Sequence, residues 1–227
     1  MTSVVIAAYN AEATLAETLA SVLGQTRPPE QFIIVDDGSV DRTAEIAVAT
    51  SSAIQVIRQA NRGAPAAMNA GVELATGDHI AFVDADDLWG KEKLATQLRA
   101  LAAKPHLDGV GGHVATFLCP TNDPEINKRY RLPAGPEPSW LPGAMLLRRR
   151  CFERCGPFAE QLRAGFFIDW LDRAKAAGLD FAMLPDIVLH RRIRPGSLSH
   201  RSPMRDGAMV EMARRAIERR RERDAPR

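Results

Sequence analysis

Four short apolar segments alternate with amphipathic segments over the first hundred residues, and this alternation constrains the fold more than any other feature of the chain. The apolar segments are SVVIA, QFIIVDD, AIQVIRQ and HIAFVDAD, which begin at residues 3, 31, 53 and 79. Each is short and almost continuously apolar, as is typical of a strand buried on both faces of a parallel sheet. The sequence therefore predicts an α/β fold, with helices on both faces of a mostly parallel central sheet.

The segments between these strands have the periodicity of surface helices. We expect Asn10 to cap the first helix and Glu12 to lie in its first turn, where the helix dipole favours a carboxylate. Further helices are expected after Ser39 or Asp41, over residues 64–76 with Gly77 at the end, and around Leu94, Leu98 and Leu101.

The second half of the chain has a different pattern. Residues 120–142 combine proline, glycine and charge with little periodicity, which predicts a loop-rich segment. A short strand is expected over 144–147 and a helix over 166–178, followed by extended structure and a basic loop near residue 194. The strong alternation of the first half is absent here.

Polar residues follow three of the four predicted strands. They are Tyr9 and Asn10, then Asp36 and Asp37, then Asp84, Asp86 and Asp87. The carboxyl ends of parallel strands meet at one edge of a sheet, where ligands of such folds bind. We therefore expect these residues to form one site.

The three aspartates at residues 84–87 repel one another, and the next cation in the sequence is Lys91. Two carboxylates spaced i, i+2 after a strand can reach one divalent ion, and Mg²⁺ or Mn²⁺ prefers such hard oxygen ligands. Such an ion would also attract a diphosphate. The alternative is an acidic turn that caps the helix starting near Lys91.

Composition narrows the class of protein. The net charge of +2 favours no polyanionic partner, so we expect no nucleic-acid binding. The three cysteines show no C-x-x-C pair and are expected to be free thiols of a reducing compartment. Neither a signal peptide nor a membrane-spanning run is evident, which predicts a cytoplasmic protein.

Residues 201–227 hold nine arginines and five acidic residues, and their pattern predicts a basic helix. One interpretation is a solvated terminal helix. The other is a surface that contacts anionic lipid at the inner membrane face or a partner protein.

Three segments together resemble the nucleotide-binding half of family 2 inverting glycosyltransferases with the GT-A fold. They are AAYNAEATLAETLASVLGQT, FIIVDDGSVDRT and NRGAPAAMNAGVELATGDHIAFVDADD, and the similarity covers roughly residues 2–104. PGAMLLRRRCFERCGPF and VLHRRIRPGS resemble the family more loosely. The resemblance implies transfer of a sugar from a nucleoside diphosphate donor, a UDP-sugar being favoured, to a hydroxyl of a saccharide or lipid-linked saccharide.

The resemblance also implies roles for individual residues. Nucleotide binding falls to Ala7, Tyr9, Asp37, Asn61, Gly63 and Asp84, and metal binding to Asp86. Relatives often have an arginine where this chain has Met68, so one phosphate or ribose contact is expected to be missing. The implied division is a nucleotide-sugar-binding half over 1–116, an acceptor-side half over 117–200 and the basic tail over 201–227.

The acceptor-side residues depart from the family pattern. An inverting transfer needs a carboxylate base, and Phe166 and Phe167 stand where the family has an acidic pair. Asp169 is the nearest remaining candidate, expected on the helix side opposite the buried face, where it faces either a cleft or solvent; Asp172 is a weaker one. This departure also supports a rival hypothesis, a catalytically silent sugar-nucleotide-binding or regulatory protein.

The basic loop departs from the family too, because this chain has Arg194 and Ser197 in the motif where relatives often carry a histidine and an asparagine. Arg192 and Arg194 are candidates to clamp the diphosphate. The alternative is a mobile cationic loop.

Overall fold

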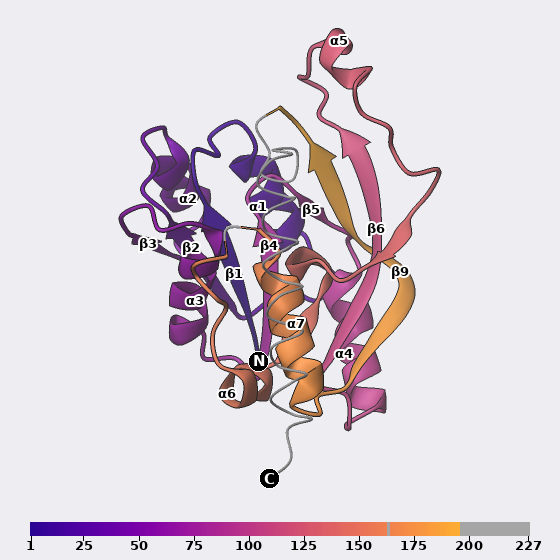
Figure 1. Ribbon diagram of the computed structural model, residues 1–227. Coiled ribbons are helices and arrows are strands. Elements are labelled where there is room, and N and C mark those ends of the chain that lie inside the picture. The colour runs from indigo at the N-terminus through magenta and orange to yellow at the C-terminus, as the bar shows by residue number, and fades with distance from the viewer. Residues whose placement is uncertain (163, 196–227) are drawn as a thin grey trace.

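The chain folds around one mixed sheet that joins both halves of the sequence. In the computed structural model, residues 1–162 and 164–195 are described, so the basic helix expected after residue 200 lies outside the described residues. The strand order is β3-β2-β1-β4-β8-β6-β9-β5, with β7 paired to β6. Figure 1 shows β6 and β9 running together toward the small helix α5 (Pro124–Asn127).

The four predicted strands are confirmed and are parallel to one another. They are β1 (Thr2–Ala8), β2 (Gln31–Asp36), β3 (Ile54–Arg58) and β4 (His79–Asp84). The remaining strands are β5 (Leu88–Trp89), β6 (Gly109–Leu118), β7 (Glu137–Ser139), β8 (Leu146–Arg148) and β9 (Phe181–Ile193). Strand β8 is antiparallel to β4 and β6, whereas β9 is parallel to β6.

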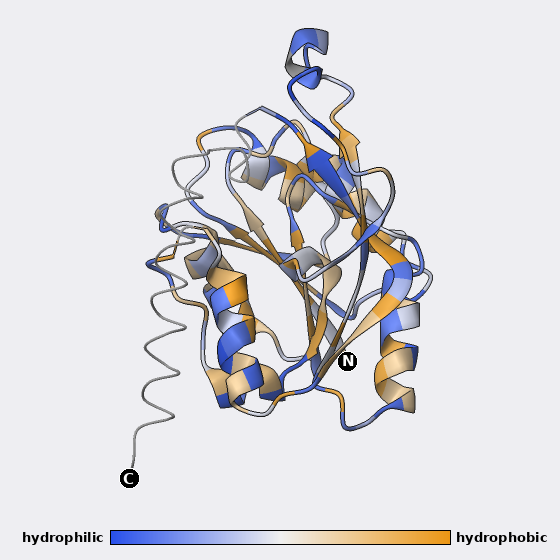
Figure 2. Ribbon diagram, turned by 45° about the vertical axis from the view of Figure 1, so that its right-hand side comes forward, coloured by the Kyte–Doolittle hydropathy of each residue, from blue (hydrophilic) through white to orange (hydrophobic). Residues whose placement is uncertain are grey.

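Helices cover both faces of the sheet, as the apolar strands require. Side chains of α1 (Leu15–Leu23), α2 (Thr43–Thr50) and α4 (Lys93–Ala103) share one apolar core with the strands. Side chains of α3 (Ala64–Leu74), α6 (Arg150–Cys155) and α7 (Phe166–Ala176) form the other. A short 3-10 helix, η1 (Pro142–Ala144), precedes β8. Figure 2 shows the apolar strands between helices whose outer faces are polar.

The expected cap of the first helix is wrong. Helix α1 begins at Leu15, and the acid in its first turn is Glu17 rather than Glu12. Asn10 has a φ of 47°, its Oδ1 accepts a hydrogen bond from the Val40 N–H (3.0 Å), and its own N–H donates to Ser39 Oγ (2.9 Å). Asn10 therefore joins the turn after β1 to the turn after β2, a contact between distant residues that local periodicity does not reveal.

Strand β6 is ten residues long although three of its residues are glycines, and it was not predicted from the sequence. A Cβ at Gly109 would lie 2.6 Å from Leu147 Cδ2, and one at Gly112 would lie 2.6 Å from Val188 Cγ1. The glycines are thus explained by close packing of β8 and β9 on β6. The strand crosses residue 116, where the division into two halves was expected; that division stays a prediction.

Within the described residues, the structure contains no helix long and apolar enough to span a membrane.

Candidate active site

The carboxyl ends of β1, β2 and β4 lie side by side, as expected for parallel neighbours. In the sheet register Ala7 is the partner of Val35 on β2 and of Asp84 on β4. Ala7 is half-buried, whereas the Tyr9 side chain beyond it is 51% exposed. This edge therefore presents an accessible aromatic ring next to a carboxylate, and such a ring can stack on a nucleobase.

The carboxylate of Asp37 holds the turn that precedes α3. Its Oδ1 accepts hydrogen bonds from Gln59 Nε2 (2.7 Å) and the Arg62 N–H (2.9 Å), and its Oδ2 accepts one from the Gly63 N–H (2.7 Å). The Asp37 side chain is buried. The structure thus brings the two predicted nucleotide-binding motifs, around Asp37 and around Asn61 and Gly63, into direct contact.

Two glycines give these turns their shape. Gly38 has a φ of +79° and Gly63 a φ of +94°, which glycine adopts without the steric cost of other residues. A Cβ on Gly38 would also lie 3.0 Å from the backbone nitrogen of Asn61. The turn after β2 therefore rests directly on the backbone of the turn before α3, and the Asn61 side chain is left exposed.

The acidic cluster after β4 contains three carboxylates in different environments. Asp84 is exposed at the sheet edge, Asp86 is partly buried, and Asp87 is buried. Desolvation by the surrounding protein and, to a lesser extent, the charge of Asp86 together raise the pKa of Asp84 to about 6, although Arg191 acts in the opposite direction. Within residues 1–162 and 164–195 no group donates a hydrogen bond to the Asp84 carboxylate, which remains accessible to a ligand.

The cations nearest to this cluster come from β9. Asp86 Oδ2 accepts a hydrogen bond from Arg194 Nε at 2.9 Å, so the two side chains form an ion pair. Arg192 is 4% exposed, and its guanidinium donates to the Asp86 backbone oxygen and to Glu17. The interpretation of this segment as a mobile cationic loop is therefore wrong for Arg192, which is fixed in a strand; its predicted role at a diphosphate stays a prediction.

Asp87 attaches β9 to the end of β4. Its Oδ1 accepts a hydrogen bond from the Arg192 N–H (2.8 Å), and its side chain is buried. Burial raises the pKa of Asp87 well above its usual value, and the charges of Asp84 and Asp86 raise it further. The sequence motif does not separate this residue from its two neighbours, because its partner is 105 residues away in the chain.

The donor set at Asp84 and Asp86 fits a hard divalent cation that takes its other ligands from water and phosphate oxygens. No cluster of three or more histidine, cysteine, aspartate or glutamate side chains able to hold a metal occurs in the described part of the chain. A two-carboxylate site is compatible with Mg²⁺ or Mn²⁺, which commonly bind through one or two carboxylates plus a substrate phosphate. Arg194 engages Asp86 Oδ2, so a cation that binds this oxygen would displace the guanidinium.

The start of α7 is packed very differently from the strand ends. Phe166 lies against Phe158 with ring centroids 5.4 Å apart, and Phe167 stacks on Trp170 at 5.8 Å. Asp169 is 3% exposed and its Oδ2 accepts a hydrogen bond from Arg173 Nε at 3.2 Å. The expectation that Asp169 lies opposite the buried face, facing a cleft or solvent, is therefore wrong; its role as a base stays a prediction.

A further contact near the site was not predicted. Glu160, in the loop before α7, accepts hydrogen bonds from Arg62 Nη2 (2.6 Å) and from Asn69 Nδ2 (3.2 Å). Asn69 also bonds the backbone of Phe158 in both directions. The loop before α7 is thereby attached to the turn that Asp37 holds, through residues that are about 90 positions apart.

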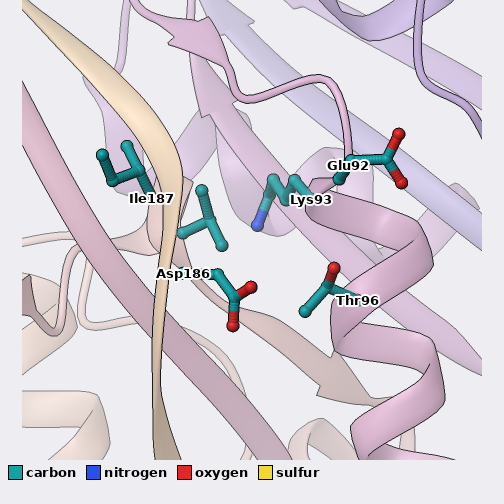
Figure 3. Close-up of a pocket in the computed structure, with 6 residues that line it drawn as sticks. Glu92, Lys93, Thr96, Asp186 and Ile187 are labelled. Carbon is teal, nitrogen blue, oxygen red and sulfur yellow. The ribbon is translucent and has the colours of Figure 1, made fainter.

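Two cavities flank the strand ends and α4. One of about 410 Å³ lies beside the arginines of β9 and is lined by Ala13, Thr14, Glu17, Cys119, Pro120, Thr121, Asn122, Asp123, Arg192, Arg194 and Pro195. The other, of about 210 Å³, lies between α4 and β9 and is lined by Glu92, Lys93, Thr96, Asp186, Ile187 and Val188 (Figure 3). None of the predicted site residues lines the second cavity.

Lys93 is the buried cation of that second cavity. Its Nζ donates to Gln97 Oε1 (2.7 Å) and to the Met145 backbone oxygen (3.1 Å), and lies 5.0 Å from the centroid of the Trp89 ring. Among the described residues no carboxylate forms an ion pair with it. Burial therefore lowers the pKa of Lys93 well below its usual value.

Taken together, the parallel sheet, the exposed tyrosine, the turn-binding aspartate and the Asp-x-Asp pair define a glycosyltransferase of the GT-A fold. A sequence model of the family described as glycosyl transferase family 2 matches residues 3–172. The chain belongs to this family.

Individual relatives agree with this assignment. WfaP of Escherichia coli, named as a UDP-Glc:alpha-D-GlcNAc-diphosphoundecaprenol beta-1,3-glucosyltransferase, is 37% identical over 100 residues, which cover 43% of this chain and 40% of that protein. The matched segments cover only 42%, 52% and 40% of the lengths of three further curated relatives. The chain therefore spans about half or less of the length of these proteins.

Two solved structures share the fold. TarS of S. aureus in complex with UDP-GlcNAc has a TM-score of 0.68 at 20% identity, covering 86% of this chain and 59% of that chain. The mannosyltransferase PcManGT from Pyrobaculum calidifontis in complex with GDP-Man and Mn²⁺ has a TM-score of 0.70 at 20% identity, covering 99% and 65%.

Proposed function

We propose that this protein is a metal-dependent inverting glycosyltransferase. It transfers a sugar from a nucleoside diphosphate sugar, with a UDP-sugar favoured, to a hydroxyl of a saccharide or lipid-linked saccharide. One observation carries the proposal: the exposed Asp84 and the neighbouring Asp86 lie at the same sheet edge as Tyr9 and the turn held by Asp37. This arrangement supports the proposal, because it would place a bound cation next to a bound nucleoside.

The nucleoside is held by the ends of β1 and β2. Tyr9 offers its exposed ring to the base, and Asp37 has one acceptor position left, because an ionised carboxylate accepts about four hydrogen bonds and three are already made. A single remaining acceptor suits the one N3–H of uracil better than the several donors on the edge of guanine. The match between one free acceptor and the one N3–H of uracil supports UDP as the nucleotide. The UDP-glucose donor in the name of WfaP also supports it.

The diphosphate is held at the end of β4. Asp86 and Asp84 would hold Mn²⁺ or Mg²⁺, which when bound neutralises the charge that develops on the departing diphosphate. The Mn²⁺ in the complex of PcManGT with GDP-Man supports this assignment. The chain's own contribution is to keep both carboxylates beside the nucleoside turn, where the sugar–phosphate bond would lie.

Transfer with inversion needs a carboxylate that accepts the proton of the acceptor hydroxyl as the new bond forms. Asp169 is our candidate for this base, near the start of α7 and in an ion pair with Arg173. In this role Arg173 would hold the carboxylate in position, and the acceptor would have to reach it from the side of the sheet edge.

The metal assignment is tested by replacing Asp86 with alanine. We expect the D86A protein to lose Mn²⁺-dependent binding of UDP, by about 100-fold or more, because a hard cation would lose a ligand that the nucleotide cannot replace. Calorimetry with and without Mn²⁺ measures this. Asp186→Ala, which removes an exposed carboxylate from β9, is the matched control and should bind like the parent. Equal binding by D86A and the parent would refute the metal site.

A second candidate function is binding of a sugar nucleotide without transfer. The packing of Phe166 and Phe167 in the apolar core, where the family has acidic residues, favours it. Incubation of a UDP-sugar panel with Mn²⁺ separates the two functions, because an active enzyme releases UDP by transfer or slow hydrolysis. Binding without any release of UDP, for every donor and acceptor tried, would favour the silent protein.

A further inference from the structure

Arg192, in β9, and Arg194, just after it, differ in the number of hydrogen bonds that their guanidinium groups make within the described residues. The guanidinium of Arg192 donates to Glu17, to the Asp86 backbone oxygen and to Cys119 Sγ, and lies 4.9 Å from the centroid of the Phe117 ring. Among residues 1–162 and 164–195, Arg194 makes one hydrogen bond, from Nε to Asp86 Oδ2. Arg192 is therefore fixed in the structure, whereas Arg194 depends on a single partner.

Most hydrogen-bonding capacity of Arg194 remains unused. A guanidinium carries five N–H donors in a planar fork, and four of them are on the two Nη atoms. Within the described residues none of these four donates to a protein group. The side chain is 28% exposed and borders the cavity of about 410 Å³, so its fork has room to move without repacking of the core.

The partner of Arg194 is also the proposed metal ligand. The Asp86 side chain is 19% exposed, and one of its two oxygens is engaged by Arg194 at 2.9 Å. A divalent cation and the guanidinium compete for this carboxylate, because both need its negative charge. When the cation comes with a diphosphate, the same event supplies a new anion for the guanidinium, and forked N–H pairs bind phosphate oxygens well.

We propose that Arg194 is a positioning residue that exchanges partners during donor binding. In the ligand-free protein Arg194 forms an ion pair with Asp86. When the metal and the nucleoside diphosphate bind, Asp86 binds the metal and Arg194 binds the diphosphate. This inference rests on the proposed function and deepens it. The exchange leaves both Asp86 and Arg194 with a partner of opposite charge in each state, which is favourable at a partly desolvated site.

The exchange makes metal and nucleotide binding interdependent. Metal alone must displace Arg194 without offering it another anion, so metal alone binds weakly. With UDP present the displaced arginine gains the diphosphate, and the metal binds more tightly. By linkage the metal tightens UDP binding by the same factor.

The experiment measures Mn²⁺ affinity, with and without saturating UDP, from the electron paramagnetic resonance signal of unbound Mn²⁺. The proteins are the parent chain, R194A, R194Q, R191A and D86A, each checked for native folding by circular dichroism. R194Q keeps a polar side chain of similar reach without the charge. R191A is the matched control, because it removes an equal charge from the end of β9, shortly before Arg194, at a residue that influences Asp84 and forms no hydrogen bond with Asp86 in the described residues.

We expect R194A and R194Q to bind Mn²⁺ alone about tenfold more tightly than the parent, the size expected for losing a charge-assisted competitor. We also expect the factor by which UDP tightens Mn²⁺ binding to fall about tenfold. R191A should change both values less than threefold, because its effect is through space alone.

Three results would overturn the inference while leaving the proposed function in place: unchanged Mn²⁺ affinity in both Arg194 variants, an unchanged UDP factor, or an equal effect of R191A. Undetectable Mn²⁺ binding without UDP in both the parent and R194A would also count against it. If instead D86A and the parent bind Mn²⁺ equally in the presence of UDP, the proposed metal site itself fails.

Discussion

Polar side chains differ in exposure and in hydrogen bonding between two regions of the molecule. One region is formed by the ends of β1, β2 and β4, and the other is the start of α7. At the strand ends, Tyr9 and Asp84 are exposed, and Asp37 is held in place by backbone donors. At α7, two phenylalanines pack into the core and Asp169 is buried in an ion pair. The first region has the polar, accessible surface of a ligand site, and the second has the packing of a structural core.

This difference teaches that binding and transfer have separate structural requirements in this chain. The strand-end site needs only the register of parallel strands and two turns, which are set within the first hundred residues. A base needs a carboxylate placed by the second half of the chain, where the loop before α7 is attached to Asn69 and Arg62. Evidence for a donor site is therefore not evidence for a base, and each region needs its own test.

The largest effect that would sharpen the contrast is expected for Asp169→Asn. If Asp169 is the base, kcat for sugar transfer should fall by about 10²–10⁴-fold, because the amide cannot accept the proton, whereas UDP affinity is kept. A coupled assay for UDP release measures the rate. Asp172→Asn, on the same helix, tests the weaker candidate base and should retain activity if Asp169 is the base. Near-normal transfer by D169N would move the base elsewhere.

At the strand ends, Asp37→Ala should weaken UDP binding by about tenfold or more, and lower the free energy of unfolding by about 1–2 kcal/mol through loss of acceptors for two backbone N–H groups. Urea unfolding and calorimetry measure the two quantities. Asp41→Ala is the matched control, because Asp41 also accepts hydrogen bonds from backbone N–H groups, those of Glu12 and Thr43. D41A should lose stability but keep UDP affinity; equal loss of affinity in both would break the contrast.

The smallest effect concerns Lys93, which belongs to neither region. Its folded-state pKa lies below the unfolded value, so between the two values the unfolded chain binds more protons and stability rises with pH. Relative to Lys93→Met, the parent should therefore gain unfolding free energy from pH 7 to pH 10, with no change in UDP affinity. Urea unfolding across this range measures it, with the exposed Lys91→Met as control. A constant difference between parent and K93M would show that Lys93 stays charged.

The sequence predicts the first half of the fold well because its information there is local. Each strand is a short apolar run, each helix has its own apolar face, and the polar residues follow the strands directly. The adjacency of Ala7 and Asp84 then follows from parallel topology alone. The same locality places the motif around Asp37 next to Asn61 and Gly63.

Contacts between distant residues were beyond local patterns. Asn10 is of a residue type common at helix N-caps, but it forms hydrogen bonds with the turn after β2. The acidic residue in the first turn of α1 is Glu17, where Glu12 was expected. Strand β6 lacks an apolar periodicity because glycines stand where side chains of β8 and β9 pack closely against it and leave no space for a side chain.

The partners of the acidic cluster were equally hidden. Asp86 and Asp87 meet Arg194 and Arg192, which lie more than a hundred residues further along the chain. The burial of Asp169 depends likewise on how α7 packs on α6.

The close approach of Gly38 to the Asn61 nitrogen has a consequence for donor choice. The contact between these two turns is made by backbone atoms, so side-chain substitutions at neighbouring positions cannot change it. A larger residue at position 38 would push the two turns apart. If a nucleotide binds at this edge as proposed, a change of its base specificity should leave these two turns unaltered and vary the exposed ring of Tyr9 instead.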